Sequence, residues 1–597
     1  MENVSIFDFL FTTKSGSQEP FKIDMSKLEE KTKWFTGETY YEYKGQEYMI
    51  LESLVMKDGK LIRVDQTGKP LAKGQVVVVP IGKEGFFYEL KSNIVGIGIL
   101  WSYGYYDQAR NEEGYLKADF IRKYYSYLKD LGILARVTIC GKEVLVKAYY
   151  LAPNIFNSAP LILLSTDIEE NDYLSRTITQ KLYDVNEETR ISQEIILGIG
   201  GVKVLDALNQ NIEIYHMNEG HSLPLVYELY NKYESLEKVK EKVIFTTHTP
   251  EDAGNEEHDI SLLHKFGFFS ALSLDKVREI TLVKEDKFNL TIGALRAAKR
   301  TNAVSKLHGV VSNKMWNSCK GSSEITSITN AQNKNFWMDK QILKAFQKDK
   351  TKDLIERKKV LKQKLFKIVA DQTGKLFDEN ILTLVWAKRF ADYKRPDLIK
   401  KDYERFKRII ENETKPVQII WAGKPYPFDI KAMNIFNDLI STSHSIKNVA
   451  VLIGYELNLS RALKCGADIW INTPRISREA SGTSGMTAAM NAAIHFSTDD
   501  GWHPEFAKDG INAFTIPPIN HDVPIQEQDE LDNKNMMDIL ENIIVPTYYD
   551  NPKKWLEIIK NSISDILPTF DSDRMADEYY KKMYLFGNNL QKDITDE

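Results

Sequence analysis

The chain has 597 residues, of which 43% are hydrophobic and 27% charged, and its formal net charge is −5. This charge balance argues against a nucleic-acid partner, and no apolar run of about 20 residues predicts a membrane span. The N-terminus lacks the features of a signal peptide, so we expect a cytoplasmic protein. Three distant cysteines match neither a disulfide framework nor a zinc site, and we therefore predict no metal: Cys140, Cys319 and Cys465.

The length exceeds one hydrophobic core, and the pattern of strands divides it. Residues 1–90 contain short alternating runs broken by Gly-containing turns, which predicts a β-rich segment. From residue 94 apolar strands alternate with helical patterns, and after a charged helical bridge at about 340–370 the alternation restarts. Continuous apolar strands separated by helices indicate parallel sheets covered on both faces. The predicted α/β units are 91–370 and 371–545, followed by C-terminal helices over 546–597. The strands that carry the prediction begin at Ile94, Leu161, Ile212, Val243, Ile381, Val417, Val449 and Ala467.

The segment Glu479–Met486 (EASGTSGM) follows the strand-like run 467–472 and opens the helix-like run 487–494. Glycines let the backbone approach a ligand, hydroxyls can donate hydrogen bonds, and the first N–H groups of a helix face negative charge. The segment predicts an anion site, with Glu479 accepting hydrogen bonds from a polyhydroxylated ligand. The alternative is a loop that only turns the chain. The candidate loop residues are Ser481, Gly482, Thr483, Ser484 and Gly485.

A cationic segment, Trp386–Arg395, directly follows another predicted strand. Open parallel sheets bind ligands beyond the carboxyl ends of their strands, and clustered Lys and Arg side chains at such a position are typical of a phosphate clamp. Interleaved Phe390 and Tyr393 argue against a solvated charge run. The four candidate cations are Lys388, Arg389, Lys394 and Arg395.

Three polar clusters stand at strand ends in the first half of the chain: 216–222, 246–255 and 301–308. Each can bind a sugar or can serve the structure alone, because a single histidine or asparagine is more often a satisfied structural residue. The candidates are Asn218, Glu219, His221, His248 and Asn302.

Taken in order, these segments resemble the α-glucan (glycogen, starch, maltodextrin) phosphorylases, in particular their short archaeal and bacterial form. The resemblance runs from about Ile94 to Phe506 and includes Ser192–Gly201 (SQEIILGIGG). It implies two Rossmann-like domains of the GT-B glycosyltransferase type, with the active site in the cleft between them. The implied reaction is phosphorolysis of an α-1,4-glucan end to glucose 1-phosphate with retained configuration, by a homodimer.

The resemblance also implies roles for individual residues. His248 would contact the glucosyl ring, Asn302 and Glu479 would bind sugar hydroxyls, and Tyr393 would flank the site. Arg389 and Lys394 would hold the substrate phosphate. Lys388 and the loop from Ser481 to Gly485 would hold a second phosphate beside it. Glu219 and His221 would shape the gate toward the polysaccharide, and Asn218 is a candidate for substrate binding beside them.

Two departures concern that second phosphate. Phosphorylases carry pyridoxal phosphate as a Schiff base on a lysine directly after the Gly-Met pair, and here that position is Thr487. The nearest downstream lysine is Lys508, and the glycine-rich phosphate loop expected before Ile94 has no counterpart. A smaller change is Ala303, where the family usually has glycine.

The residues leave three hypotheses open. The protein can be a phosphorylase that binds pyridoxal phosphate without that lysine or replaces its phosphate. It can be a nucleotide-sugar-dependent glucan synthase, because related two-domain transferases use a similar Arg/Lys pair and glutamate on a diphosphate. It can also be a non-catalytic α-glucan-binding protein.

Overall fold

The computed structural model describes residues 94–156, 158–208, 212–251, 254–520 and 522–585, together with the backbone of strands before residue 81. Those early strands, in a segment we predicted to be β-rich, form an antiparallel sheet in the order β2-β8-β5-β4-β3 and a hairpin β6-β7. No helix in the described part is long and apolar enough to cross a membrane. The strands are β1 (Phe9–Thr13), β2 (Lys22–Asp24), β3 (Glu29–Thr32), β4 (Thr39–Tyr43), β5 (Gln46–Ile50), β6 (Ser53–Lys57), β7 (Lys60–Val64) and β8 (Gln75–Pro80).

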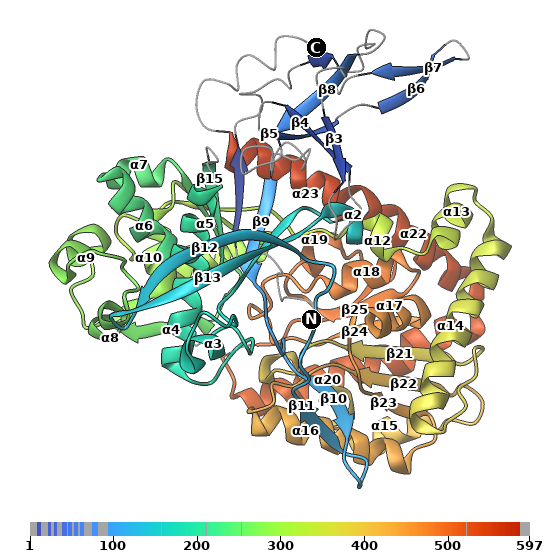
Figure 1. The fold of residues 1–597 in the computed structure, drawn as a ribbon. Coiled ribbons are helices and arrows are strands. Elements are labelled where there is room, and N and C mark those ends of the chain that lie inside the picture. The colour runs from blue at the N-terminus through green and yellow to red at the C-terminus, as the bar shows by residue number, and fades with distance from the viewer. Residues whose placement is uncertain are drawn as a thin grey trace, which may run out of the picture.

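A nine-stranded sheet in the order β12-β13-β14-β9-β1-β15-β16-β19-β20 organises the N-terminal unit, which extends from β9 to α12 (Figure 1). The four strands that we predicted here run in one direction and are mostly buried, as expected for strands covered on both faces. The strands are β9 (Ile94–Ile99), β12 (Lys129–Ile139), β13 (Lys142–Leu151), β14 (Leu161–Ser165), β15 (Ile212–Asn218), β16 (Val243–Thr246), β19 (Arg300–Ala303) and β20 (Ile325–Ser327).

The sheet is mixed, however, whereas we expected a parallel sheet. β12 and β13 form an antiparallel edge, and β1 runs antiparallel between β9 and β15. Along β12 from Leu134 to Ile139, exposed and buried residues alternate, because one face of this ribbon meets solvent. The prediction relied on continuous apolar runs. A strand with one face in solvent has no such run, so the prediction missed β12 and β13.

The C-terminal unit, which extends from α13 to α22, contains a six-stranded, entirely parallel sheet in the order β23-β22-β21-β24-β25-β26. In chain order this is 3-2-1-4-5-6, the doubly wound order in which ligands bind where the strand order reverses, here between β21 and β24. The strands are β21 (Leu382–Ala387), β22 (Val417–Ala422), β23 (Val449–Leu452), β24 (Ile469–Asn472), β25 (Ile494–Thr498) and β26 (Ala513–Ile516).

Helices cover both sheets. In the N-terminal unit they are α2 (Pro153–Phe156), α3 (Tyr173–Thr177), α4 (Glu187–Ile195), α5 (Gly201–Ala207), α6 (Pro224–Tyr233), α7 (Leu236–Lys240), α8 (Ile260–Phe266), α9 (Leu274–Thr281), α10 (Leu290–Ala297), α11 (Lys306–Met315) and α12 (Lys334–Trp337). In the second half they are α13 (Lys340–Gln347), α14 (Thr351–Thr373), α15 (Tyr403–Ile410), α16 (Ile430–Ser445), α17 (Leu457–Gly466), α18 (Ser484–Met490), α19 (His503–Phe506), α20 (Ile525–Ile539), α21 (Val545–Asp550), α22 (Pro552–Thr569) and α23 (Ser572–Tyr579).

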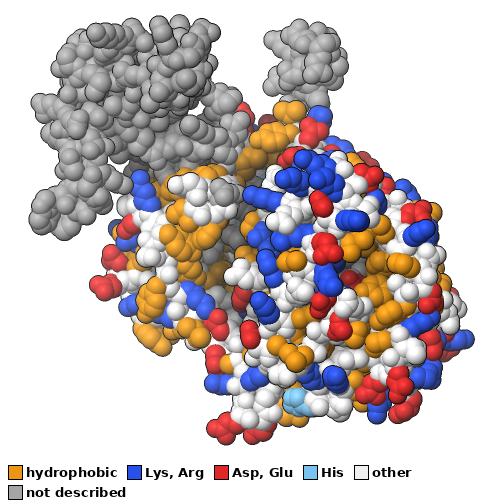
Figure 2. Space-filling model, turned by 90° about the vertical axis from the view of Figure 1, so that its right-hand side faces the viewer, with side chains coloured by type: hydrophobic (Ala, Val, Ile, Leu, Met, Phe, Trp, Pro, Cys, Tyr) orange, Lys and Arg blue, Asp and Glu red, His pale blue; other side chains and the backbone are white. Residues whose placement is uncertain are grey.

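The charged segment that we predicted as a helical bridge forms α13 and α14. On the face where these helices lie, Lys and Arg side chains intermingle with Asp and Glu (Figure 2). The inner side of α14 is different, since Lys358 and Lys362 are buried there. The Lys362 ammonium pairs with Asp468, and both side chains are almost completely buried.

Two connections fix the units against each other. A ribbon of β10 (Asp107–Arg110) and β11 (Leu116–Asp119) leaves the N-terminal unit and packs on α16, where Arg110 donates to the carbonyl of Val451 at 2.8 Å (Figure 1). The chain also returns at its end, because α22 and α23 lead from the C-terminal unit back to the N-terminal sheet (Figure 1). Met583, after α23, packs with Ile214 and Ile244 of that sheet.

Replacing Asp468 by alanine should lower the free energy of unfolding by about 3–5 kcal/mol, because the Lys362 ammonium would stay buried without its counter-charge. The midpoint of chemical denaturation measures this effect. The control is Glu379→Ala, which removes the partly exposed partner of Lys359 on the same helix and should leave the midpoint almost unchanged. Equal midpoints for both variants would show that the buried pair does not hold α14 on its sheet.

Candidate active site

The end of β15 positions the loop that follows β16. Glu219, in the left-handed region at φ 72°, accepts hydrogen bonds at Oε2 from the backbone N–H of His248 (2.7 Å) and from Thr249 Oγ1 (3.0 Å). Asn218 Oδ1 bonds to His248 Nε2. Burial, and secondarily the positive His221, lower the pKa of His248, although Glu219 opposes them. Asn218 and Glu219 therefore hold a neutral His248 in one orientation.

His221 belongs to a charged cluster that the sequence did not predict. Its Nδ1 lies 3.6 Å from Oε1 of Glu194, and Glu256 completes a group whose ligand-type atoms lie within 4.8 Å of one another. Burial alone would lower the pKa of His221, but Glu194 and Glu256 raise it to about 9. Arg190 pairs with Glu256, so positive side chains already balance the carboxylates. Glu194 lies within the segment 192–201 that the resemblance to phosphorylases includes, so the sequence did offer one indication of this cluster.

Asn302 is the next-to-last residue of β19, beside Thr246 of β16, and its side chain is completely buried. Its Oδ1 accepts from Thr246 Oγ1 at 2.7 Å, and its Nδ2 donates to Tyr579 Oη at 3.0 Å. A sugar hydroxyl would have to displace Tyr579 to reach this amide.

The cationic segment after β21 divides into ligand-facing and structural side chains. Lys394 and Glu479 form a buried ion pair at 2.6 Å, and the Lys394 ammonium lies 5.1 Å from the centre of the Tyr393 ring. Burial alone would lower the pKa of Lys394, but the Glu479 carboxylate and Tyr393 raise it above its ordinary value. Lys388 is buried and donates to Asn472 Oδ1.

Arg389 differs from its neighbours because its side chain is exposed and makes no hydrogen bond or ion pair with the described residues. Burial alone would lower the pKa of Arg389, but the nearby Tyr393, Tyr183 and Tyr105 raise it. The grouping of Arg395 with the clamp is wrong. That residue, at φ 44°, turns away and pairs with Asp532 at 2.6 Å and Asp529 at 3.0 Å.

The loop after β24 connects both units. Ser305 at the start of α11 donates to the carbonyl of Ala480 at 2.7 Å, and Arg478 pairs with Glu251 at 3.0 Å. Asp500 Oδ2 accepts the backbone N–H of Glu479 at 2.8 Å. These contacts bring the segments around residues 248, 389 and 479 to one place, which we call the junction.

Within the loop, the hydroxyls have different environments. Ser481 Oγ is buried without a hydrogen-bond partner among the described residues, and Gly482 takes φ 84°. Ser484 Oγ accepts from the Trp470 indole at 3.1 Å, which leaves its O–H free to donate. Thr487 is completely buried and donates to the carbonyl of Ser484 at 2.9 Å. Gly485 packs on His495, whose Nε2 would lie 2.5 Å from an added Cβ.

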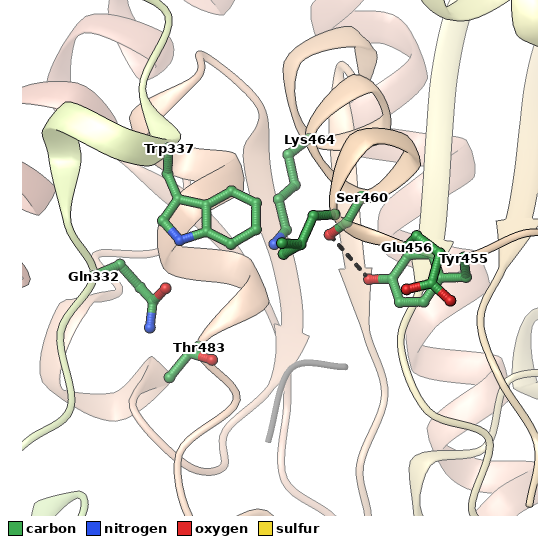
Figure 3. Close-up of a pocket in the computed structure, with 8 residues that line it drawn as sticks. Gln332, Trp337, Tyr455, Glu456, Ser460, Lys464 and Thr483 are labelled. Carbon is green, nitrogen blue, oxygen red and sulfur yellow. Dashed lines mark hydrogen bonds between the residues drawn. The ribbon is translucent and has the colours of Figure 1, made fainter. Parts of the chain in front are cut away.

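A cavity of about 120 Å³ lies beside Thr483 (Figure 3). The Lys464 ammonium enters it from α17 and lies 3.7 Å from the centre of the Trp337 ring. Sequence reasoning missed Trp337 and Lys464, because only the packing of α12 and α17 against the loop reveals them. The lining residues are Gln332, Trp337, Tyr455, Glu456, Leu457, Ser460, Lys464 and Thr483.

This cavity does not fit the cofactor implied by the resemblance, although part of its lining has suitable chemistry. Trp337 offers an aromatic wall, Lys464 a primary amine, and Ser460 and Thr483 offer hydroxyls. A cavity of about 150 Å³ admits a benzene ring alone, so 120 Å³ leaves no room for a pyridine ring with its phosphate group, and the lining also contains the carboxylate of Glu456.

Two α/β units with convergent polar residues at the carboxyl ends of parallel strands are typical of an enzyme that binds an anionic ligand. Residues 279–514 match the family model described as carbohydrate phosphorylase. The chain belongs to this family.

Three curated relatives extend the comparison. An uncharacterized protein of Methanocaldococcus jannaschii is 46% identical over 83% of this chain and 93% of its own length. Maltodextrin phosphorylase of Thermococcus litoralis is 31% identical over 82% of this chain and 66% of its own length. Glycogen phosphorylase of Aquifex aeolicus is 29% identical over 82% and 80%, respectively.

Asp500 should make the stability depend on pH, because burial raises its pKa to about 7 and the nearby Glu479 carboxylate adds to this effect. The folded state then binds a proton that the unfolded state releases near its ordinary value of 3.8. The contribution to stability is fully present below pH 4 and is lost as pH rises to about 7, a loss of a few kcal/mol.

We therefore expect Asp500→Asn to remove this slope when unfolding is measured between pH 4 and pH 8. The control is Asp573→Asn, whose carboxylate is 84% exposed and which should retain the wild-type slope. Parallel profiles for wild type and Asp500→Asn would contradict the role of Asp500.

Proposed function

We propose that the protein is an α-glucan phosphorylase that cleaves the end of an α-1,4-glucan with orthophosphate and releases glucose 1-phosphate. The observation that carries the proposal is Arg389, a cation that makes no hydrogen bond or ion pair with the described residues and lies beside the buried Lys394–Glu479 pair. A planar guanidinium binds a phosphate through two parallel hydrogen bonds. Membership of the carbohydrate phosphorylase family and similarity to maltodextrin and glycogen phosphorylases support it.

In this proposal the two units are the two domains of a GT-B architecture and the junction is the active site. The domain limits are those given by the sequence, 91–370 and 371–545. A homodimer is likewise proposed, on the family resemblance alone.

The sugar would lie between the units. His248 is held by Asn218 and Glu219 so that its backbone carbonyl and ring face the glucosyl residue. Glu479 would accept a sugar hydroxyl while keeping its ion pair with Lys394. The Ser481 hydroxyl, buried without a partner in the described part, would find one in the ligand.

The substrate phosphate would lie against Arg389 with Lys394 behind it. Both cations stay charged at neutral pH, because the surrounding tyrosines and Glu479 raise their pKa values. They stabilise the negative charge of the phosphate as the glycosidic bond breaks, and their fixed positions avoid reorganisation during the reaction.

The deciding experiment is glucose 1-phosphate release from a maltooligosaccharide by orthophosphate, with and without added pyridoxal phosphate. We expect phosphate-dependent release, and a comparison of the two arms shows whether the cofactor contributes. Glucose incorporation from a nucleotide sugar without such release would indicate a glucan synthase. Glucan binding without turnover in any arm would indicate a binding protein.

Arg389→Ala should lower kcat/KM for phosphorolysis by about 30- to 1000-fold, which corresponds to about 2–4 kcal/mol of transition-state stabilisation. The matched control is Arg408→Ala, an exposed arginine on α15 that pairs with Glu541 away from the junction. Unchanged phosphorolysis in Arg389→Ala, with glucan binding intact, would remove Arg389 from the phosphate site.

A further inference from the structure

We propose that the charged cluster around His221 is a binding site for one divalent transition-metal ion, and that Zn²⁺ is the ion its donors suit best. The inference does not rest on the proposed function. The spacing of the cysteines gave no sign of such a site, because its donors are imidazoles and carboxylates. The ligands would be Glu194, His221, Glu256 and His258.

Three segments of the chain bring these donors together. Glu194 lies on α4, His221 in the turn after β15, and Glu256 directly before β17 (Glu257–Asp259), the strand that contains His258. The ligand-type atoms of the first three lie within 4.8 Å of one another. The ligands of one zinc ion lie about 3.3 Å apart, so these atoms would have to close by at most about 1.5 Å. The side chains of His221 and Glu256 are each 30% exposed, which gives them room to move and gives an ion a route into the cluster.

Several atoms of the cluster are buried without a hydrogen-bond partner. The Glu194 side chain is only 3% exposed, and neither of its oxygens has such a partner among the described residues. The same holds for Glu256 Oε2 and His258 Nε2, which lie 3.6 Å apart, too far for a hydrogen bond. Buried polar atoms are nearly always paired. Orphaned atoms that converge from separate segments therefore indicate that something binds between them.

The orientation of His258 is typical of a metal ligand. Its Nδ1 bonds to Glu187 Oε1 at 2.7 Å, and its side chain is 8% exposed. A metal-bound imidazole usually donates its other ring N–H to a carboxylate, which fixes the tautomer and directs the lone pair at the ion. The buried His216 is different, because both of its ring nitrogens are bonded, to Tyr584 and Thr246. Nothing in the surroundings of His216 points to a ligand.

The charges of the cluster leave a place for a divalent ion. Three carboxylates, those of Glu187, Glu194 and Glu256, face one arginine, Arg190. With neutral histidines this leaves two negative charges, which is the charge that one divalent cation balances. Arg190 bonds to Oε1 of Glu256, so Oε2 remains for the ion. In the absence of an ion, protons on the two histidines supply the same charge, and metal binding replaces those protons.

The donor set indicates the kind of ion and its role. Imidazoles favour zinc and other transition metals, whereas Mg²⁺ and Ca²⁺ prefer sites made of oxygen alone. Four protein ligands would complete a tetrahedral shell, which is typical of a structural ion. This ion would join α4, the turn after β15 and the start of β17. It would thereby fix the far end of the segment that connects β16 to β17 and contains His248.

The test is isothermal titration calorimetry of the full-length protein, freed of metal by dialysis against EDTA, with ZnCl₂ as the probe. We expect saturable binding of about one Zn²⁺ per chain. The melting temperature should rise with added ZnCl₂, because an ion that binds only the folded state stabilises it. MgCl₂ should produce neither effect, since the site contains two imidazoles.

Two ligand variants should abolish the binding of Zn²⁺. Glu194→Gln removes a carboxylate charge with little change of shape. His221→Gln removes an imidazole whose side chain is partly exposed, so that the fold tolerates the change. If Glu194→Gln fails to fold by circular dichroism, His221→Gln decides the assignment.

A third variant tests the carboxylate behind His258. Glu187→Ala removes no ligand and should weaken the binding of Zn²⁺ by about 10- to 100-fold, because the imidazole loses the group that orients it. The matched control is Glu188→Ala, at the next exposed position of α4, which should bind as wild type does. His264→Gln, at an exposed histidine of α8, controls for binding to the surface and should also be unchanged.

No saturable Zn²⁺ binding by the wild type would overturn the inference and leave the cluster as a network of protonated histidines and carboxylates. Binding that survives in Glu194→Gln, or that is lost in His264→Gln, would also overturn it, because the ion would then be held elsewhere. The titration needs no glucan, so its outcome does not depend on whether the protein is a phosphorylase.

Discussion

The buried ion pair between Lys394 and Glu479 is the interaction on which the arrangement of the junction depends. It joins the segment after β21 to the loop after β24, two neighbouring strands at the point where the strand order reverses. Both side chains are more than nine-tenths buried, so either charge alone would be strongly unfavourable. The pair therefore fixes the two segments at one separation, and this sets where Arg389 leaves the surface and where the Ser481 hydroxyl points.

Other contacts of the junction hold the same loop after β24 in place. Asp500 holds the backbone at Glu479, and Ser305 holds the carbonyl of Ala480 from the N-terminal unit. In that unit Asn218 and Glu219 hold His248, so this candidate sugar contact is positioned by hydrogen bonds from the end of the neighbouring strand. A preorganised site of this kind has little reorganisation to undergo when charge develops on a ligand.

The sequence was sufficient for the strands that are buried on both faces, because their apolar runs are continuous, and for the position of the polar segments at strand ends. It was not sufficient for β12 and β13, whose alternating pattern depends on which face meets solvent. Arg395 was grouped with the clamp because spacing alone cannot show that a left-handed backbone turns its side chain toward Asp532. Lys464 and Trp337 are 127 residues apart in the chain (464 − 337), and only helix packing brings them together. The roles in sugar binding remain predictions, because burial and hydrogen bonds show how residues are held and not what they bind.

The return of α23 to the N-terminal sheet affects how the protein folds during its synthesis on the ribosome. Ile214 and Ile244 pack on Met583, and Asn302 donates a hydrogen bond to Tyr579. Both partners lie more than 270 residues later in the chain. Because domains generally fold in the order of their synthesis, the N-terminal unit emerges with part of its sheet uncovered and waits for the entire C-terminal unit before that surface closes. Nascent chains therefore expose this surface until the end of translation, and a loss of the last 30 or so residues would disturb the N-terminal sheet first.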